Sequence, residues 1–139
     1  MTSAQRGDDV EIGPALNVFV SYQKADASAR DDLIHALSRV DLSFLFCPLR
    51  DDDEESWRDA ARNLIHESSG TLVLIGRTTH LSDPVAWEIA ETRRVGNPVL
   101  GIELDSAAGR EDLLLIDVDM RIAWDPIEIE SRLREWKKP

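Results

Sequence analysis

The stretch Thr71-Leu72-Val73-Leu74-Ile75-Gly76 is the clearest strand in the sequence. It contains no charged residue, it is rich in aliphatic side chains, and it closes on a glycine. A short apolar run without alternation is typical of a strand buried on both faces, as in a parallel sheet. This segment therefore predicts the centre of an α/β domain.

Strand and helix patterns alternate on the N-terminal side of this segment. The run Leu16-Asn17-Val18-Phe19-Val20, which ends at Ser21-Tyr22, predicts a first strand, and Ser43-Phe44-Leu45-Phe46 predicts a second. Two sets of apolar residues at steps of three and four predict the helices that follow these strands. They are Ala29, Leu33, Leu37 and Val40 for the first helix, and Trp57, Ala61, Leu64 and Ile65 for the second.

The alternation continues on the C-terminal side. Asp83-Pro84 predicts a helix that begins with Asp83 as its N-cap, and Gly96-Asn97-Pro98 predicts its end. Val99-Leu100-Gly101-Ile102 predicts a fourth strand, and residues 120–123 predict a short fifth. Asp125-Pro126 repeats the helix-start signal, and the last apolar stripe consists of Ile129, Leu133 and Trp136.

These patterns together predict a flavodoxin-like doubly wound parallel sheet of five strands, in the order 2-1-3-4-5. We expect one α/β domain over residues 16–139, preceded by a flexible leader at residues 1–15. In such sheets ligands bind at the carboxyl ends of the strands, beside the point where the strand order reverses. Candidate functional residues are therefore those that directly follow each strand.

Composition restricts the partners of the chain. Its 139 residues include 27 acidic and 16 basic side chains, a net charge of −11, which disfavours binding to nucleic acid and to anionic membranes. The one cysteine, Cys47, excludes an intramolecular disulfide and a cysteine-rich zinc site. No apolar run approaches the roughly 20 residues that span a bilayer. We therefore expect a cytoplasmic protein without a membrane partner.

Several common enzyme motifs are absent from the sequence. It has no phosphate-binding loop of the Walker type, no G-x-G-x-x-G after the first strand, and no G-x-S-x-G. The third strand ends in Gly76-Arg77, where a phosphate-accepting receiver domain would need an aspartate. The acidic run at residues 51–55 is expected to be a solvated loop before a helix, and no metal site is predicted.

Two groups of segments resemble Toll/interleukin receptor (TIR) domains. Val18-Phe19-Val20-Ser21-Tyr22, followed by Asp26, is similar to the first conserved box of that family. Val73-Leu74-Ile75-Gly76-Arg77, then Glu88-Ile89, then the fourth strand, resemble its third strand, third helix and fourth strand. The run from Glu88 to Leu104 looks closest to the TIR-like subunit of Thoeris anti-phage systems. The resemblance covers about residues 16 to 104.

The resemblance implies an enzyme that takes NAD as its substrate rather than as a cofactor. Such an enzyme releases nicotinamide and hydrolyses or cyclises the remainder, and a nucleotide product would act on an effector. It also implies self-association, because TIR-like enzymes generally need neighbouring copies. The family's catalytic glutamate falls on Glu88. An ionised carboxylate there would stabilise the positive charge that develops on the ribose.

The other candidate site residues follow from the same resemblance. Ring-stacking partners would come from Phe19, Tyr22 or Trp57, and basic groups for the pyrophosphate from Lys24, Arg50 and Arg77. Ser21 would contact the ligand or cap the next helix. One departure concerns the tryptophan that TIR domains commonly carry four residues before the glutamate. Here that position is Pro84, and Trp87 directly precedes Glu88.

Other interpretations remain open from the residues themselves. On a helical wheel Ala86, Ile89, Ala90 and Arg93 share a face and Glu88 lies away from it, which predicts a solvated glutamate if the helix is considered alone. Glu91 is the second candidate carboxylate. The chain would otherwise be a non-catalytic TIR-type interaction module, or an N-glycoside enzyme similar to nucleoside deoxyribosyltransferases.

Overall fold

The computed structural model of the chain describes residues 16–47, 54–104 and 120–137. The leader predicted at residues 1–15 lies outside them. The strands are β2 (Leu16–Ser21), β3 (Leu42–Leu45), β4 (Gly70–Ile75), β5 (Val99–Glu103) and β6 (Arg121–Ala123). The α-helices are α2 (Ala27–Ala36), α3 (Glu54–His66), α4 (Asp83–Arg94) and α5 (Pro126–Arg134). Short 3-10 turns occur at Lys24–Asp26, Thr79–Leu81 and Glu135–Lys137.

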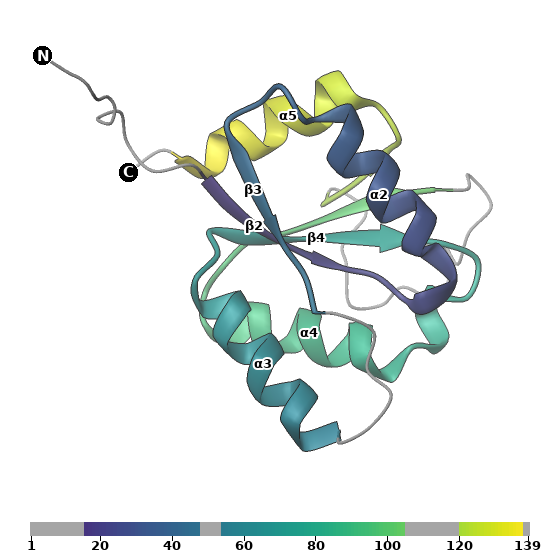
Figure 1. The fold of residues 1–139 in the computed structure, drawn as a ribbon, viewed down its shortest axis with the longest axis vertical. Coiled ribbons are helices and arrows are strands. Elements are labelled where there is room, and N and C mark those ends of the chain that lie inside the picture. Colours follow the sequence, from purple (N-terminus) through teal and green to yellow (C-terminus); the bar gives the residue numbers. More distant parts are fainter. Residues whose placement is uncertain (1–15, 48–53, 105–119, 138–139) are drawn as a thin grey trace, which may run out of the picture.

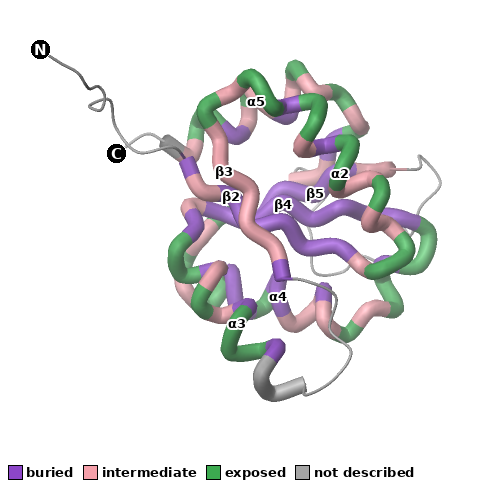
Figure 2. Tube along the Cα trace, viewed as in Figure 1, coloured by how far each residue is buried: buried purple, intermediate pink, exposed green. Residues whose placement is uncertain are grey.

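The five strands form one sheet in the order β3-β2-β4-β5-β6. Every pair of neighbours is parallel, with Ser21 beside Val73 and Val73 beside Gly101. In chain order this is 2-1-3-4-5, so the predicted topology is confirmed. The central strand β4 is buried along its whole length, whereas the edge strand β3 is half-buried (Figure 2).

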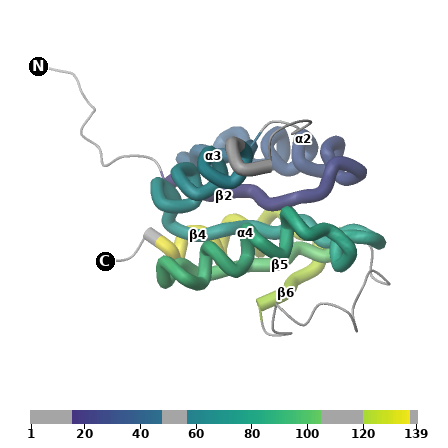
Figure 3. The backbone as a smooth tube through the Cα atoms, turned by 90° about the horizontal axis from the view of Figure 1, so that it is seen from below, coloured from purple at the N-terminus to yellow at the C-terminus, as the bar shows by residue number. Residues whose placement is uncertain are grey.

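Within the described residues, two α-helices cover each face of the sheet. Figure 1 shows α2 and α5 on one face and α3 and α4 on the other, and Figure 3 views the molecule from the side of α3 and α4. Side chains of β2 alternate between the faces: Val18 and Val20 pack in the cluster of α2 and α5, and Phe19 packs against α3. None of the helices in the described ranges is long and apolar enough to cross a membrane.

The ends of α4 follow local sequence signals, with one correction. The N-cap is Ser82, not the predicted Asp83, because the Ser82 hydroxyl accepts a hydrogen bond from the Val85 backbone N–H at 3.3 Å. At the other end Gly96 adopts a φ of 85°, a left-handed conformation that glycine tolerates and that ends the helix. The helix α2 also ends earlier than its apolar stripe predicted, at Ala36.

The buried face of α4 differs from the prediction of the helical wheel. Its buried residues are Val85, Glu88, Ile89, Glu91 and Thr92. Ala90 and Arg93, which the wheel placed on the apolar face, are exposed. The physical reason is that α4 packs both on the sheet and on α3, so a second, partly polar side of the helix is covered as well.

Glu91 links α4 to α3 through a cluster of ion pairs. Arg94 donates to it with two nitrogens, at 2.9 and 2.6 Å, and His66 of α3 lies 3.1 Å away. Arg62 of α3 adds an ion pair at 3.8 Å. Arg94 holds the pKa of Glu91 at about 2, well below its ordinary 4.5, with His66 adding to the effect and burial opposing it. The pairing holds α4 against α3.

We expect Glu91→Gln to lower the free energy of unfolding at pH 7 by about 1 to 2 kcal/mol, because Arg94 and Arg62 are partly in solvent and screened. A carboxylate with a lowered pKa stabilises the fold at pH values above 4.5, its pKa in the unfolded chain. The stabilisation is lost as the pH falls from there through about 2, its pKa in the folded protein. Urea denaturation of wild type and variant at pH 7 and pH 3 should therefore give a smaller difference at pH 3.

The matched control is Glu128→Gln, which removes an exposed ion pair with Arg132 four residues along α5. Its effect should stay below about 0.5 kcal/mol at both pH values. An equal difference between wild type and Glu91→Gln at the two pH values would show that the ion pairs of Glu91 do not stabilise the fold.

Candidate active site

Glu88 lies in the second turn of α4 and points toward the carboxyl end of β2. Its side chain is only 2% exposed, and the Ser21 hydroxyl donates a hydrogen bond to its Oε1 at 2.5 Å. Ser21 is the last residue of β2 and is itself fully buried. A buried carboxylate needs hydrogen-bond donors to offset the loss of hydration, and Ser21 supplies one.

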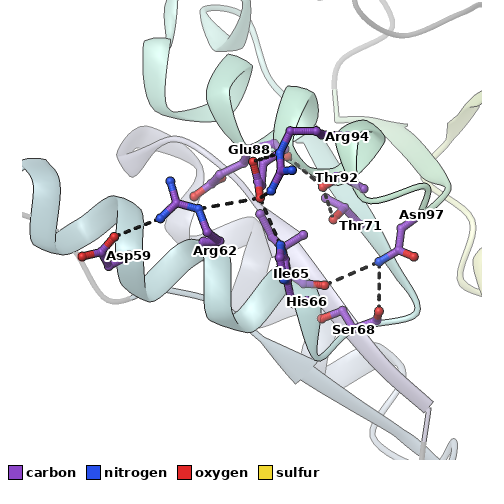
Figure 4. Close-up of polar contacts among 11 residues, drawn as sticks. Asp59, Arg62, Ile65, His66, Ser68, Thr71, Glu88, Thr92, Arg94 and Asn97 are labelled. Carbon is purple, nitrogen blue, oxygen red and sulfur yellow. Dashed lines mark hydrogen bonds and ion pairs between the residues drawn. The ribbon is translucent and has the colours of Figure 1, made fainter.

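A second pair of hydroxyls fixes the helix turn that carries Glu88. The Thr92 side chain donates to the backbone carbonyl of Glu88 at 2.7 Å. Thr92 also lies 2.8 Å from the hydroxyl of Thr71, at the start of β4 (Figure 4). Both threonines are fully buried. Glu88 is thus tied to β2 through its carboxylate and to β4 through its backbone.

The strand order reverses between β2 and β4, beside Glu88. Gly76 follows β4, and its backbone N–H donates to the Thr79 hydroxyl at 2.8 Å. Thr79 lies 3.4 Å from the carboxylate of Asp26, whose pKa is raised by burial against the opposing hydrogen bonds from Thr79 and Gln23. A Cβ at Gly76 would lie 2.5 Å from Asp26 Oδ2, so only glycine leaves room for that carboxylate.

Two tryptophans and two arginines lie where α3 and α4 meet. The rings of Trp57 and Trp87 are 5.4 Å apart, and the guanidinium groups of Arg58 and Arg62 lie 5.8 and 5.5 Å from the Trp87 ring centroid. Trp57 is 7% exposed, whereas Trp87 is half-buried. Arg62 also bonds Asp59 at 2.9 Å (Figure 4).

The structure brings Ser21 together with Glu88 but does not place Phe19 or Tyr22 where its ring could stack on a ligand. Phe19 is fully buried against Trp57 and offers no exposed ring face to a ligand. Tyr22 lies in the cluster on the opposite face of the sheet, where its hydroxyl accepts a hydrogen bond from Arg30 at 2.6 Å. A stacking role for either ring therefore does not fit this arrangement, because strand alternation puts Tyr22 on the other face of the sheet and core packing buries Phe19.

Two of the three predicted basic groups lie near the same edge of the sheet. Lys24 follows β2, Arg77 follows β4, and both are exposed. Arg50 lies outside the described residues, as does most of the acidic run at residues 51–55. Among the residues that the structure describes, no group of histidine, cysteine, aspartate or glutamate side chains is arranged to hold a metal ion.

The sequence did not single out the supporting residues of the site. Thr92 lies four residues after Glu88, and this spacing is the signal for a side chain that reaches back to the Glu88 carbonyl. Thr71 opens the most apolar strand of the chain, and only the folded sheet places it beside Thr92. The ion pairs of Glu91 explain why this second candidate carboxylate serves the contact between two helices.

Comparisons with known proteins agree on the fold. The TIR domains of the activated Roq1 resistosome match with a TM-score of 0.50 and 17% identity over 66% of this chain, which spans 58% of theirs. The CMP N-glycosidase BcmB of Clostridium botulinum matches with a TM-score of 0.56 and 15% identity, over 86% of this chain and 98% of that one. A search of the curated proteins found no match.

A family model gives the more specific result. The model of the TIR-like domain of the Thoeris protein ThsB matches residues 19–109 of this chain. That range is more than half of the 139 residues and contains β3, β4 and β5, the second half of β2, and the helix that carries Glu88. The chain belongs to the family of ThsB TIR-like domains.

Proposed function

We propose that the chain is an NAD-processing enzyme that cleaves the bond between nicotinamide and ribose, with Glu88 as its catalytic residue. One observation carries this proposal: a buried carboxylate, bonded by Ser21, lies at the carboxyl end of β2 beside the strand-order reversal. Ligands of doubly wound sheets bind at this position. The TIR-like family of the chain supports the same assignment.

The chemistry requires few groups from the protein. The nicotinamide nitrogen carries a positive charge in NAD, and nicotinamide leaves as a neutral molecule, so no general acid is needed. Positive charge moves onto the ribose as the bond breaks, and a carboxylate that binds the ribose hydroxyls stabilises it. Water then gives linear ADP-ribose, whereas attack from within the same molecule gives a cyclic product. We propose that the product is a signal for an effector in anti-phage defence.

A second candidate substrate is a nucleoside monophosphate. The likeness to the CMP N-glycosidase covers nearly all of that protein, and its substrate also carries a base on a ribose. Cytosine is a poorer leaving group than nicotinamide and gains from protonation, so this reaction needs a general acid in addition to Glu88. Incubation with NAD and with CMP, followed by detection of free nicotinamide and free cytosine, separates the two candidates.

We expect Glu88→Gln to lower the rate of nicotinamide release by a factor of about 10² to 10³, because glutamine keeps the shape but not the charge. The amide oxygen can still accept from Ser21, so the free energy of unfolding should change by no more than about 1 to 2 kcal/mol. The measurement is nicotinamide release by wild type and variant, with urea denaturation of both.

Glu91→Gln is the control, since it makes the same change one turn away in a carboxylate held by Arg94 and His66. The Glu91→Gln variant should have a lower free energy of unfolding. Under conditions in which it is folded, its rate of nicotinamide release should equal that of wild type. Full activity of Glu88→Gln would exclude the catalytic role and would favour a non-catalytic interaction module. Loss of activity in Glu91→Gln alone would assign the catalytic role to Glu91, one turn further along α4.

Assembly is the second expectation. Glu88 is almost inaccessible in the single chain, so a substrate reaches it only after neighbouring groups move. We expect contacts between copies to favour the open form, and the net charge of −11 to oppose them at low ionic strength. Activity per molecule should rise with protein concentration and with added salt. Constant specific activity in a sample shown to be monomeric by light scattering would exclude this.

A further inference from the structure

We propose that Ser21 is a positioning residue, which acts on the substrate only through Glu88 and does not bind the ligand itself. The inference rests on the proposed function, because it assigns a partner to the proposed catalytic carboxylate. It differs from the expectation drawn from the sequence, in which Ser21 contacts the ligand or caps a helix.

The first observation is the contact itself. The hydroxyl of Ser21 donates to Glu88 Oε1 at 2.5 Å, and the two residues are 67 positions apart in the chain. Ser21 is 0% exposed and Glu88 is 2% exposed. A serine hydroxyl has one proton, and here it is used inside the protein. Ser21 therefore has no second hydrogen to donate to a ribose hydroxyl.

The second observation is that β2 is a rigid support for this hydroxyl. Ser21 ends a strand that pairs with a neighbour on each side, and its own partner in β4 is Val73. The strand residues next to the site, Phe19 and Val20, are buried in the core. A donor fixed to such a strand holds the plane of the carboxylate better than a donor on a loop.

The third observation concerns how Glu88 is held. The bond from Thr92 to the Glu88 carbonyl and the contact between Thr92 and Thr71 fix the helix turn, whereas the bond from Ser21 acts on the side chain itself. Glutamate has three side-chain torsions, and restricting them costs entropy. Ser21 engages Oε1 and so sets the direction of Oε2. The hydroxyl thus fixes the orientation in which the carboxylate meets the ribose, before the substrate arrives.

The test is Ser21→Ala, measured by nicotinamide release from NAD. We expect kcat to fall by about 10- to 100-fold, the usual effect of losing one hydrogen bond to a charged group, with KM changed by less than about threefold. The rate of the double variant Ser21→Ala/Glu88→Gln should lie within about twofold of the rate of Glu88→Gln alone. Ser21→Thr restores the hydroxyl and should recover most of the lost rate.

Ser68→Ala is the matched control. Ser68 is also a buried serine, but its hydroxyl donates to the Leu64 carbonyl at 2.7 Å, at the opposite end of β4 from Gly76. This variant loses one hydrogen bond of similar length without touching Glu88, and its kcat should equal that of wild type. Thermal melts of all variants show whether a loss of rate merely follows a loss of fold.

A measurement without substrate provides a second readout. The unfolding equilibrium constants of wild type, Ser21→Ala, Glu88→Ala and the double variant give the coupling between Ser21 and Glu88. This coupling should exceed about tenfold in the unfolding equilibrium constant. Absence of coupling would overturn the proposal even if the protein showed no activity.

Other outcomes separate this inference from the proposed function. A raised KM with unchanged kcat in Ser21→Ala would make Ser21 a ligand contact and overturn the positioning role, as would additive losses in the double variant. Full activity of Ser21→Ala beside an inactive Glu88→Gln would overturn this inference alone. Full activity of Glu88→Gln would instead overturn the proposed function.

Discussion

The hydrogen bond between Ser21 and Glu88 is the contact on which the geometry of the site depends. It places a carboxylate that is 2% exposed at the carboxyl end of β2, where the strand order reverses. Burial of such a group is unfavourable unless donors compensate it. The strand end and the helix α4 therefore have to meet at this point, and the polar contacts of Thr92 and Glu91 keep the helix there.

The two faces of the sheet are built differently. The side of α2 and α5 is a single apolar cluster that includes Val18, Leu33 and Ile129. The side of α3 and α4 contains smaller apolar clusters, with Glu88, Glu91 and Thr92 buried between them. Polar groups in the interior add less stability than apolar side chains of the same size, but they impose a specific geometry. The apolar face thus supplies stability, and the polar face positions the carboxylate.

The solved structures that resemble this chain include the TIR domains of the activated Roq1 resistosome and the CMP N-glycosidase of Clostridium botulinum. At 15 to 17% identity these matches establish the shared fold. A fold alone does not determine a reaction, and our proposal of NAD as the substrate therefore depends on Glu88, its donor Ser21 and the ThsB TIR-like family. What the two kinds of substrate share is a base bonded to a ribose, and one carboxylate suits the charge that develops in either reaction.

The sequence by itself determined the strand order and the limits of most elements. Apolar runs such as Thr71 to Gly76, helix starts such as Asp125-Pro126 and the glycine at position 96 are local signals, and local signals are readable along the chain. The helical wheel predicted the wrong buried face for α4, because a wheel assumes one buried side and this helix packs on both the sheet and α3. The contacts of Ser21 with Glu88 and of Thr71 with Thr92 join residues 67 and 21 positions apart. Only the tertiary structure decided these contacts, because a hydroxyl and a carboxylate bond according to their distance in space and leave no periodic trace in the sequence.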